Sequence, residues 1–472
     1  MKRAILLLLV VCFGIVTPSI ASESQQIDRF VSDLLRDVPE VPSIGIAVVR
    51  EGKTVYLREP RTGYYIGSTT KAYTGLACAI LAQRGTLDLD VPITKYLPEA
   101  KLQNAPTLRA LLTHTSGLEN NGIVWRTSVT GEHTPAQLVS LLAYSKPGQP
   151  GFHYSNLGYV VASLAIERVT GKPWQDALRD LVFKPLGMNR TTAYMSEAKK
   201  KPMATAYLVN RKGAVEVVSL TKTDRTMHAA GGIVTTPEDL AKWLNANIEA
   251  GGGGIPHAAF AAAQAMQVPA TLQRGDLTAR GYGFGWYIGE LKGENARFHQ
   301  GGYAGWQSSF SFLPDKKIGA GIMINASGPI SQRVLLVVTS YINDLLLGKS
   351  PDSAAIVADF KANLVKGRAF LIADAEKRAA RPWMLQHPNG AYTGTYENPQ
   401  FGTMTIREEG GHLVATTGGV RSVLEAFTEP ETARVELVPE NGEVVRFRFA
   451  GGDKAASLAW GTDEFTRVNG SQ

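Results

Sequence analysis

Ser68 and Lys71 have the residue types and the spacing that nucleophilic catalysis needs. They lie in Gly67-Ser68-Thr69-Thr70-Lys71, directly before an apolar-periodic run that is typical of a helix. Residues three apart share a helix face, so we expect Ser68 in the first turn with its hydroxyl beside the amine. A hydroxyl is a weak nucleophile that needs a neighbouring base. A lysine can be that base when burial or a nearby cation lowers its pKa.

Acyl transfer also needs a group that returns a proton to the leaving group. Tyr154 and Asn156 stand in Tyr154-Ser155-Asn156, after a loop rich in proline and glycine at residues 147–151. The same short patterns occur elsewhere: Ser-x-x-Lys at 196–199 and 219–222, and Tyr-x-Asn at 341–343 and 396–398. Neither of the other Ser-x-x-Lys strings begins an apolar helix. The Ser-x-x-Lys pattern therefore indicates a catalytic pair only where an apolar helix follows it.

His299-Gln300-Gly301-Gly302 ends a predicted strand and is the third candidate element. A glycine there allows a substrate backbone to approach and offers an N–H to an oxyanion. His299 is expected to hydrogen-bond substrate or to adjust the proton affinity of the tyrosine. His114, by contrast, is interpreted as a structural residue that bonds local backbone.

The elements that must position these residues are predicted from periodicity. Strands are expected near both ends of the first part of the chain, with helices and loops between them and a long apolar helix after them. This order predicts an α+β fold, in which early and late strands join one antiparallel sheet flanked by helices and a helical lobe. The strands and helices with clear patterns are residues 26–36, 43–49, 54–57, 108–118, 158–169, 297–300, 307–313, 318–325 and 330–347.

The tail has a different pattern. Residues 353–380 are charged and helical, and from residue 391 short alternating strands follow at turn-rich intervals. About eight strands are expected, the first around Tyr392, and they predict a small antiparallel β-barrel. The predicted organisation is a signal peptide at 1–21, a first domain at 22–350, a helical linker at 351–387 and a barrel domain at 388–472.

The N-terminus and the composition bear on location and partners. Lys2 and Arg3, the apolar residues 4–16 and small residues before Ala21 are typical of an export signal, so a periplasmic or extracellular protein is expected, without a transmembrane span in the mature chain. Removal of the export signal leaves Cys78 as the only cysteine, and Cys78 is expected to be a buried apolar side chain. The net charge of +7 is spread without a basic stripe, which argues against nucleic acid as a partner.

Taken in order, these elements resemble the serine β-lactamase and penicillin-binding-protein superfamily, on the branch of class C β-lactamases, DD-peptidases, D-aminopeptidases and esterases. The tail resembles a lipocalin-like barrel that is appended to some members. The resemblance runs from about residue 26 to residue 347 and rests on Ile66 to Lys71, Leu111 to Leu118, Tyr154 to Asn156, Pro185 to Met188 and Ala229 to Gly232.

The resemblance implies roles for individual residues. Ser68 would be the acylated nucleophile, and Lys71 and Tyr154 would share the work of base and acid, with the first proton acceptor left open. Asn156 would orient the substrate amide. His299 to Gly301 would stand where many relatives have Lys-Thr-Gly. The N–H groups of Ser68 and Gly302 would form the oxyanion hole.

The predicted function is an exported serine hydrolase of small-molecule or peptide substrates, such as D-amino-acid peptides or β-lactam-like compounds. A carboxylesterase of the same fold is the main alternative, because the lysine that usually binds the substrate carboxylate is replaced by His299. A penicillin-binding or sensor protein without turnover is the alternative of another class. No cofactor and no metal site are expected, and the oligomeric state is left open.

Overall fold

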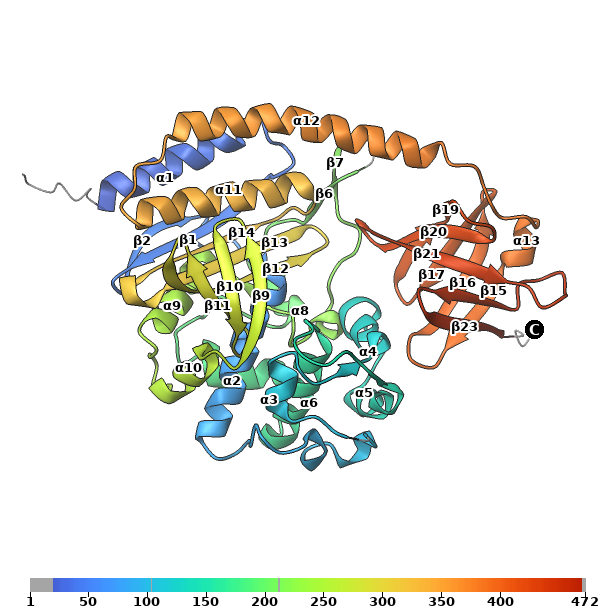
Figure 1. Ribbon diagram of the computed structural model, residues 1–472, viewed down its shortest axis with the longest axis horizontal. Helices are drawn as coiled ribbons and strands as arrows, with labels where there is room; N and C mark the ends of the chain where they lie inside the picture. Colours follow the sequence, from blue (N-terminus) through green and yellow to red (C-terminus); the bar gives the residue numbers. More distant parts are fainter. Residues whose placement is uncertain (1–19, 103, 211–212, 469–472) are drawn as a thin grey trace, which may run out of the picture.

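The computed structural model describes residues 20–102, 104–210 and 213–468. The predicted export signal lies outside these residues, apart from its last two positions. Figure 1 shows two bodies: a main body of sheet and helices, and a C-terminal barrel to its side. None of the helices in the described ranges is both long and apolar enough to cross a membrane.

The main body is built on an eight-stranded antiparallel sheet with the order β2-β1-β14-β13-β12-β11-β10-β9. The pairing of β1 with β14 confirms that early and late strands join one sheet. Strands β9 to β11, between residues 268 and 291, were not predicted. The bounds are β1 Ile44–Arg50, β2 Lys53–Arg58, β9 Val268–Arg274, β10 Leu277–Tyr282, β11 Tyr287–Leu291, β12 Glu294–Tyr303, β13 Trp306–Leu313 and β14 Ile318–Ile324.

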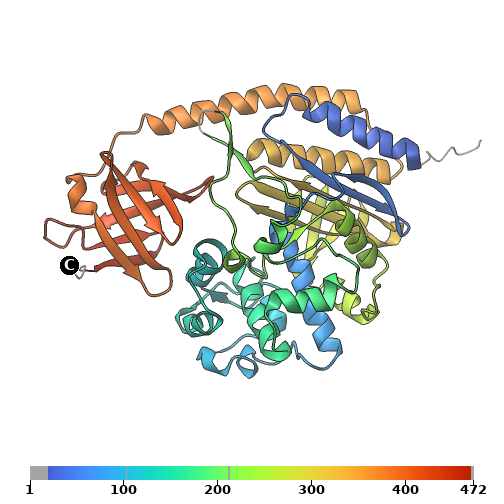
Figure 2. The same cartoon turned by 180° about the vertical axis from the view of Figure 1, so that it is seen from behind.

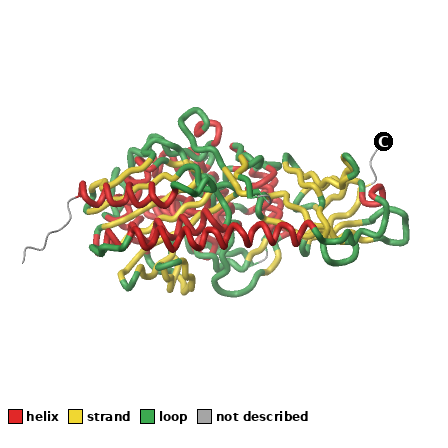
Figure 3. The backbone as a smooth tube through the Cα atoms, turned by 90° about the horizontal axis from the view of Figure 1, so that it is seen from above, coloured by secondary structure: helices red, strands yellow, loops and turns green. Residues whose placement is uncertain are grey.

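One face of the sheet is covered by helices α1, Ile20–Leu35, and α11, Pro329–Leu346. Phe30 of α1 stacks on Tyr341 of α11, with ring centroids 3.7 Å apart. Helix α12, Ser353–Ala379, buries Phe360 and Leu364 against the same core and then runs on to the barrel (Figures 1 and 3). The α+β prediction and the closing apolar helix are thereby confirmed.

The other face carries α2 and α9, and the helical lobe lies below it (Figures 1 and 2). The predicted helix at 108–118 is shorter than expected: α3 ends at Leu112, because the chain turns through His114 and Gly117, both with positive φ. Cys78 of α2 is fully buried, as predicted. The helices are α2 Thr70–Gln83, α3 Leu108–Leu112, α4 Asn121–Trp125, α5 Pro135–Leu141, α6 Leu157–Thr170, α7 Trp174–Leu178, α8 Met195–Ala198, α9 Pro237–Ile248 and α10 His257–Gln264.

Three two-stranded ribbons complete the main body. Strand β3, Tyr64–Tyr65, pairs with β8, Val234–Thr235. In the lobe, β4, Leu118–Glu119, pairs with β5, Lys146–Pro147. A further ribbon joins β6, Tyr207–Val209, and β7, Val215–Val217.

The barrel is antiparallel, as predicted, and its nine strands run in the order β18-β17-β16-β15-β23-β22-β21-β20-β19. The strand expected around Tyr392 is wrong: residues Asn389–Tyr392 form the short helix α13, and the first strand begins at Gly394. The Tyr392 ring is buried there and its hydroxyl donates to Glu431 at 2.6 Å. The strands are β15 Gly394–Asn398, β16 Gly402–Glu409, β17 His412–Thr417, β18 Val420–Val423, β19 Glu425–Ala426, β20 Thr432–Val438, β21 Asn441–Arg448, β22 Ser457–Trp460 and β23 Asp463–Val468.

Candidate active site

Ser68 lies in a tight turn that leads directly into α2. The turn, Gly67–Thr69, has 3₁₀ geometry, so Ser68 precedes the α-helix and does not lie in its first turn as expected. Gly67 has a φ of +53° and packs so closely on β12 that a Cβ there would lie 2.8 Å from the Gly302 nitrogen. The three-residue spacing still brings Lys71 Nζ to 3.2 Å from Ser68 Oγ.

Lys71 is completely buried and has no carboxylate partner in the described part of the chain. Its Nζ lies 2.7 Å from Asn156 Oδ1 and 2.9 Å from the Ala230 carbonyl oxygen. Burial lowers the pKa of this amine well below its usual value, because the low-polarity surroundings disfavour the charged form. The shift favours the neutral amine. In that form two N–H groups suffice for the two carbonyl oxygens, and the lone pair can face the Ser68 hydroxyl.

Tyr154 and Asn156 reach this amine from the loop that precedes α6. The Tyr154 ring lies 4.7 Å from Lys71 Nζ, and its hydroxyl forms a hydrogen bond with Ser68. Burial of that hydroxyl raises the pKa of Tyr154, and the hydrogen bond from Ser68 opposes this only in part. The residue as a whole is 42% exposed, so Tyr154 lies between the buried amine and the solvent.

His114 holds the loop that carries Tyr154. Its Nδ1 accepts a hydrogen bond from the Ser155 N–H at 3.1 Å, and its carbonyl accepts one from the His153 N–H at 2.8 Å. Its ring packs 4.5 Å from the Tyr154 ring. Burial lowers the pKa of His114 well below its usual value, so the ring stays neutral beside Lys71. The prediction that His114 bonds backbone is confirmed, but the N–H that its ring accepts from lies 41 residues along the chain and is not local.

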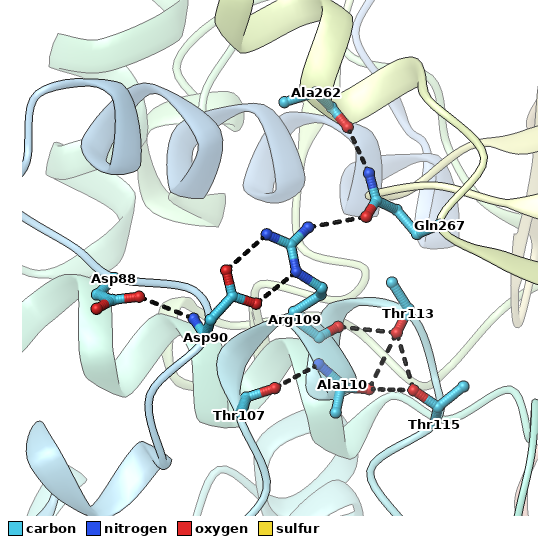
Figure 4. A network of polar contacts seen from close by, with 9 residues as sticks. All are labelled: Asp88, Asp90, Thr107, Arg109, Ala110, Thr113, Thr115, Ala262 and Gln267. Carbon is cyan, nitrogen blue, oxygen red and sulfur yellow. Dashed lines mark hydrogen bonds and ion pairs between the residues drawn. The ribbon is translucent and has the colours of Figure 1, made fainter.

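A polar network anchors the turn that contains His114 (Figure 4). Arg109 of α3 binds Asp90 with two hydrogen bonds, at 2.6 and 2.9 Å, and donates to Gln267 Oε1 at 2.8 Å. Thr113 caps the end of α3 by donating to the Arg109 carbonyl at 2.8 Å. The network therefore ties the lobe to the segment that enters β9.

The end of β12 closes the site on the side opposite Tyr154. A Cβ at Gly301 would lie 2.0 Å from the Ile66 carbonyl oxygen and 2.8 Å from the Ser68 nitrogen, so only glycine fits there. Ser308 of β13 also donates to the Ile66 carbonyl, at 2.8 Å. This close approach brings the backbone of Gly302 next to that of Ser68, where the resemblance expects the oxyanion hole.

His299 is fixed inside the protein. It is 2% exposed, its Nδ1 lies 2.7 Å from the Gln300 carbonyl oxygen, and its Nε2 lies 3.2 Å from the Tyr282 hydroxyl. Burial, aided by the nearby Lys71, lowers the pKa of His299 to about 3. The ring is therefore neutral at ordinary pH, with a protein partner at each nitrogen, and its centroid lies 6.0 Å from that of Tyr154.

The structure thus groups Ser68, Lys71, Tyr154 and Asn156 directly, with Gly301 and Gly302 against the serine turn and His299 behind the surface. Ser68 opens into a hollow of about 560 Å³ that Tyr154, His299 and Gly302 also line. The hydrogen bond from Lys71 to the Ala230 carbonyl was not predicted, although Ala229-Ala230-Gly231-Gly232 is one of the stretches that carry the resemblance. No group of three or more His, Cys, Asp or Glu side chains in the described ranges could hold a metal ion.

The family profile named Beta-lactamase matches residues 31–336, which is more than half of the chain. The chain belongs to this family of serine hydrolases. Among curated proteins, Protein flp of Staphylococcus aureus (strain MW2) is 28% identical over 325 residues, covering 64% of this chain and 63% of that protein. The chain therefore spans less than two thirds of that relative.

Solved structures of the same fold include both parts of the chain. The octameric penicillin-binding protein homologue from Pyrococcus abyssi superposes with a TM-score of 0.59 at 22% identity, covering 94% of this chain and 99% of that one. A D-stereospecific amidohydrolase from Streptomyces sp. is 27% identical, with a TM-score of 0.53, and covers 67% of this chain and 97% of its own. The first likeness extends the shared fold into the barrel.

Proposed function

We propose that this protein hydrolyses amide bonds through an acyl intermediate on Ser68. The observation that supports this most is the setting of Lys71. Its amine is completely buried, has no counter-ion among the described residues, is held by two carbonyl oxygens and lies 3.2 Å from the serine hydroxyl. A buried amine of lowered pKa is a base at neutral pH. Tyr154, whose pKa is raised, keeps its proton under the same conditions. Lys71 is therefore the better first acceptor.

The reaction follows from these protonation states. Lys71 takes the Ser68 proton as Oγ attacks the carbonyl carbon, and the N–H groups of Ser68 and Gly302 receive the developing oxyanion. The amide C–N bond then breaks, and Tyr154 delivers a proton to the leaving nitrogen while Lys71 returns its proton to Tyr154. Water repeats the sequence on the acyl ester and restores Ser68. Asn156 holds Lys71 in place, and we assign its amide group to substrate orientation.

The substrate class follows from the neutral state of His299. The Lys-Thr-Gly relatives have a cation at this position, whereas here the ring is neutral and tied to Tyr282. The only charged side chain that lines the Ser68 hollow in the described chain is Arg274, on the exposed edge strand β9. We therefore propose acyl donors without a carboxylate next to the reacting bond. D-amino-acid amides and peptides fit this, in keeping with the D-stereospecific amidohydrolase among the similar structures.

Short esters are the second candidate class. The acyl chemistry on Ser68 is the same for an ester, and an alcohol leaves more readily than an amine. Among the described residues that line the hollow, Arg274 on the exposed edge strand is the one cation, so the leaving group does not need a negative charge. Measuring kcat/KM for D-alanine p-nitroanilide against p-nitrophenyl acetate ranks the two classes.

The deciding experiment is covalent labelling with a fluorophosphonate probe. Wild type is expected to be labelled and to hydrolyse D-alanine p-nitroanilide faster than the L form, whereas Ser68→Ala does neither. Ser219→Ala is the matched control, because Ser219 starts another Ser-x-x-Lys string and is exposed. Equal labelling of wild type and Ser68→Ala would overturn the proposal, and would favour a binding protein without turnover.

We also propose that the protein acts outside the cytoplasm, on the strength of the charged and apolar pattern at residues 2–21. Fractionation of expressing cells, with N-terminal sequencing of the mature protein, tests this. Recovery of the chain in the cytoplasm with residues 1–21 intact would contradict it.

A further inference from the structure

A second hollow lies between the helical lobe and the barrel. It measures about 520 Å³, and we call it the interdomain cleft. Figure 1 shows α4 on the side of the lobe that faces the barrel, and this helix supplies one wall. The other wall comes from β21 and the turn between β22 and β23. Tyr303, the residue after Gly302, lines the cleft from the main body.

The interdomain cleft is joined to the Ser68 hollow by shared walls. Tyr154 lines both the Ser68 hollow and a smaller hollow of about 190 Å³. Asn121 and Val124 of α4 line both that smaller hollow and the interdomain cleft. The three hollows therefore follow one another along the surface from β12 to the barrel. A substrate longer than a single residue would extend from Ser68 along this groove.

The cleft has firmly packed walls. Trp125 of α4 meets Trp460 of the barrel edge to face, with ring centroids 4.6 Å apart. Arg126 Nε donates to the Gln400 carbonyl at 2.6 Å, and a Cβ on Gly122 would lie only 2.5 Å from the Gln400 side chain. Such close contacts hold the barrel against the lobe, so the shape of the cleft is set before any ligand binds.

Glu443 gives the cleft an unbalanced negative charge. Its carboxylate is half-buried, accepts hydrogen bonds from the Trp460 side chain and from Asn441 Nδ2, the latter at 3.3 Å, and takes part in no ion pair with any residue of the described chain. Asp463, the other acid in the cleft, is already paired with Lys146 at 3.4 Å. Burial raises the pKa of Glu443, as expected for a carboxylate that lacks a cation.

The aromatic residues supply the rest of a cation site. Phe401 lines the cleft together with the two tryptophans, and so does Tyr303, one face of which is already covered by Lys222 Nζ at 3.6 Å from the ring centre. Aromatic faces beside a carboxylate attract an ammonium group, since both are electron-rich toward the cation. The indole N–H of Trp125 is buried in this wall, and among the described residues it has no hydrogen-bond partner.

We propose that the interdomain cleft binds the free amino end of a peptide acyl donor, with Glu443 as the counter-ion of its ammonium group. The inference rests on the proposed function, because it assigns the acyl part of the substrate to the side of the groove that leads to the barrel. An extended residue spans at most about 3.3–3.6 Å, so the length of peptide that binds best measures the separation of Ser68 from Glu443.

The test is equilibrium binding to the full chain carrying Ser68→Ala, measured by calorimetry, so that turnover plays no part. The probes are D-alanine oligomer amides of two to five residues, each with a free and with an acetylated amino end. At the fitting length we expect the free amine to bind about tenfold more tightly, an order typical of a partly desolvated ion pair. Adding Glu443→Gln removes that preference. Adding Glu397→Gln, an exposed acid on the same barrel, keeps it.

Three results would overturn the proposal: equal affinity for free and acetylated oligomers at every length, a preference that survives Glu443→Gln, or no binding of either series. Failure of the proposed function is seen separately. It would appear as wild-type protein that neither reacts with a fluorophosphonate nor hydrolyses p-nitrophenyl acetate, a substrate without an amine. The calorimetric result with Ser68→Ala stands in either case.

Discussion

Two lysines in this protein follow a serine at the same spacing, and both are buried without a carboxylate partner in the described chain. Lys71 is 0% exposed and Lys222 is 5% exposed, and burial lowers the pKa of each well below its usual value. Lys71 faces the hydroxyl of its own motif, Ser68, at 3.2 Å. Lys222 instead donates to the Ser128 carbonyl at 2.5 Å and lies 3.6 Å from the centre of the Tyr303 ring.

The difference lies in the elements that carry them. Ser68 lies in a tight turn that runs directly into a helix, so residues 68 and 71 share one face. Ser219 is exposed in a loop without that geometry, and the contacts of Lys222 go to the lobe and to β12. Burial alone therefore favours the neutral form of an amine but does not make it a catalytic base. A base also needs an acidic proton within reach and access to the solvent.

Replacement of Lys71 is the strongest test of this contrast. Lys71→Met keeps the length of the side chain and removes the base, so the rate of acylation is expected to fall by about 10³-fold or more. The rate of fluorophosphonate labelling measures it, with circular dichroism to show that the fold is intact. Lys222→Met is the matched control and should stay within about fivefold of wild type. Comparable losses of labelling rate in both variants would contradict the claim that only Lys71 acts as a base.

Replacement of Tyr154 tests whether its hydroxyl carries a proton between the Ser68–Lys71 pair and the leaving group. Lys222 is not described with such a hydroxyl beside a serine. Tyr154→Phe removes the hydroxyl beside Ser68 and is expected to lower kcat/KM for D-alanine p-nitroanilide by about 10²-fold. An ester should be affected less, because its leaving group needs less help from a proton. Tyr341→Phe changes the tyrosine of another Tyr-x-Asn string, which is stacked on Phe30, and serves as control. A loss of equal size in the Tyr341 variant would count against the assignment.

The pH dependence of the free energy of unfolding tests whether the buried lysines are neutral, independently of any measurement of activity. A lysine whose pKa is lower in the folded state binds more protons when unfolded, so stability rises with pH between the folded pKa and the usual value near 10.4. Each such lysine contributes up to about 1.4 kcal/mol per pH unit to that slope. Lys222→Met should therefore flatten the slope between pH 7 and pH 9, as measured by urea unfolding. An unchanged slope would mean that Lys222 is not held neutral.

Much of the site follows from sequence because its parts lie on elements with clear patterns. Ser68 and Lys71 are close in sequence, at the turn that enters α2 and in the first residues of that helix, and the loop with Tyr154 and Asn156 is set by the start of α6. The sequence order of early strands, helical lobe and late strands already predicts that the serine turn, the Tyr154 loop and the end of β12 meet. The strand expected at Tyr392 failed because alternation alone does not distinguish a strand from a single helical turn before one.

The surroundings of His299 could not be read from the sequence. Its burial depends on Tyr282, which lies on β10, and the hairpin of β9 and β10 was missed. Pro269 lies within β9, where it weakens a strand pattern, and it is tolerated because β9 is the edge of the sheet. The Ala230 carbonyl that accepts a hydrogen bond from Lys71 belongs to the backbone, so no side-chain pattern predicts this contact. Without these contacts the charge state of His299 and Lys71 stays open.

Tyr303 offers the finest test of what Lys222 does. Its hydroxyl donates to the Ser128 carbonyl at 3.1 Å, the same oxygen that Lys222 binds. Tyr303→Phe removes that hydrogen bond and leaves the ring under the amine, so the free energy of unfolding should fall by about 1 kcal/mol. Because Lys222 stays buried, the pH slope should match that of wild type. A slope that flattens as in Lys222→Met would mean that the hydroxyl, and not the packing of the ring, keeps Lys222 from water.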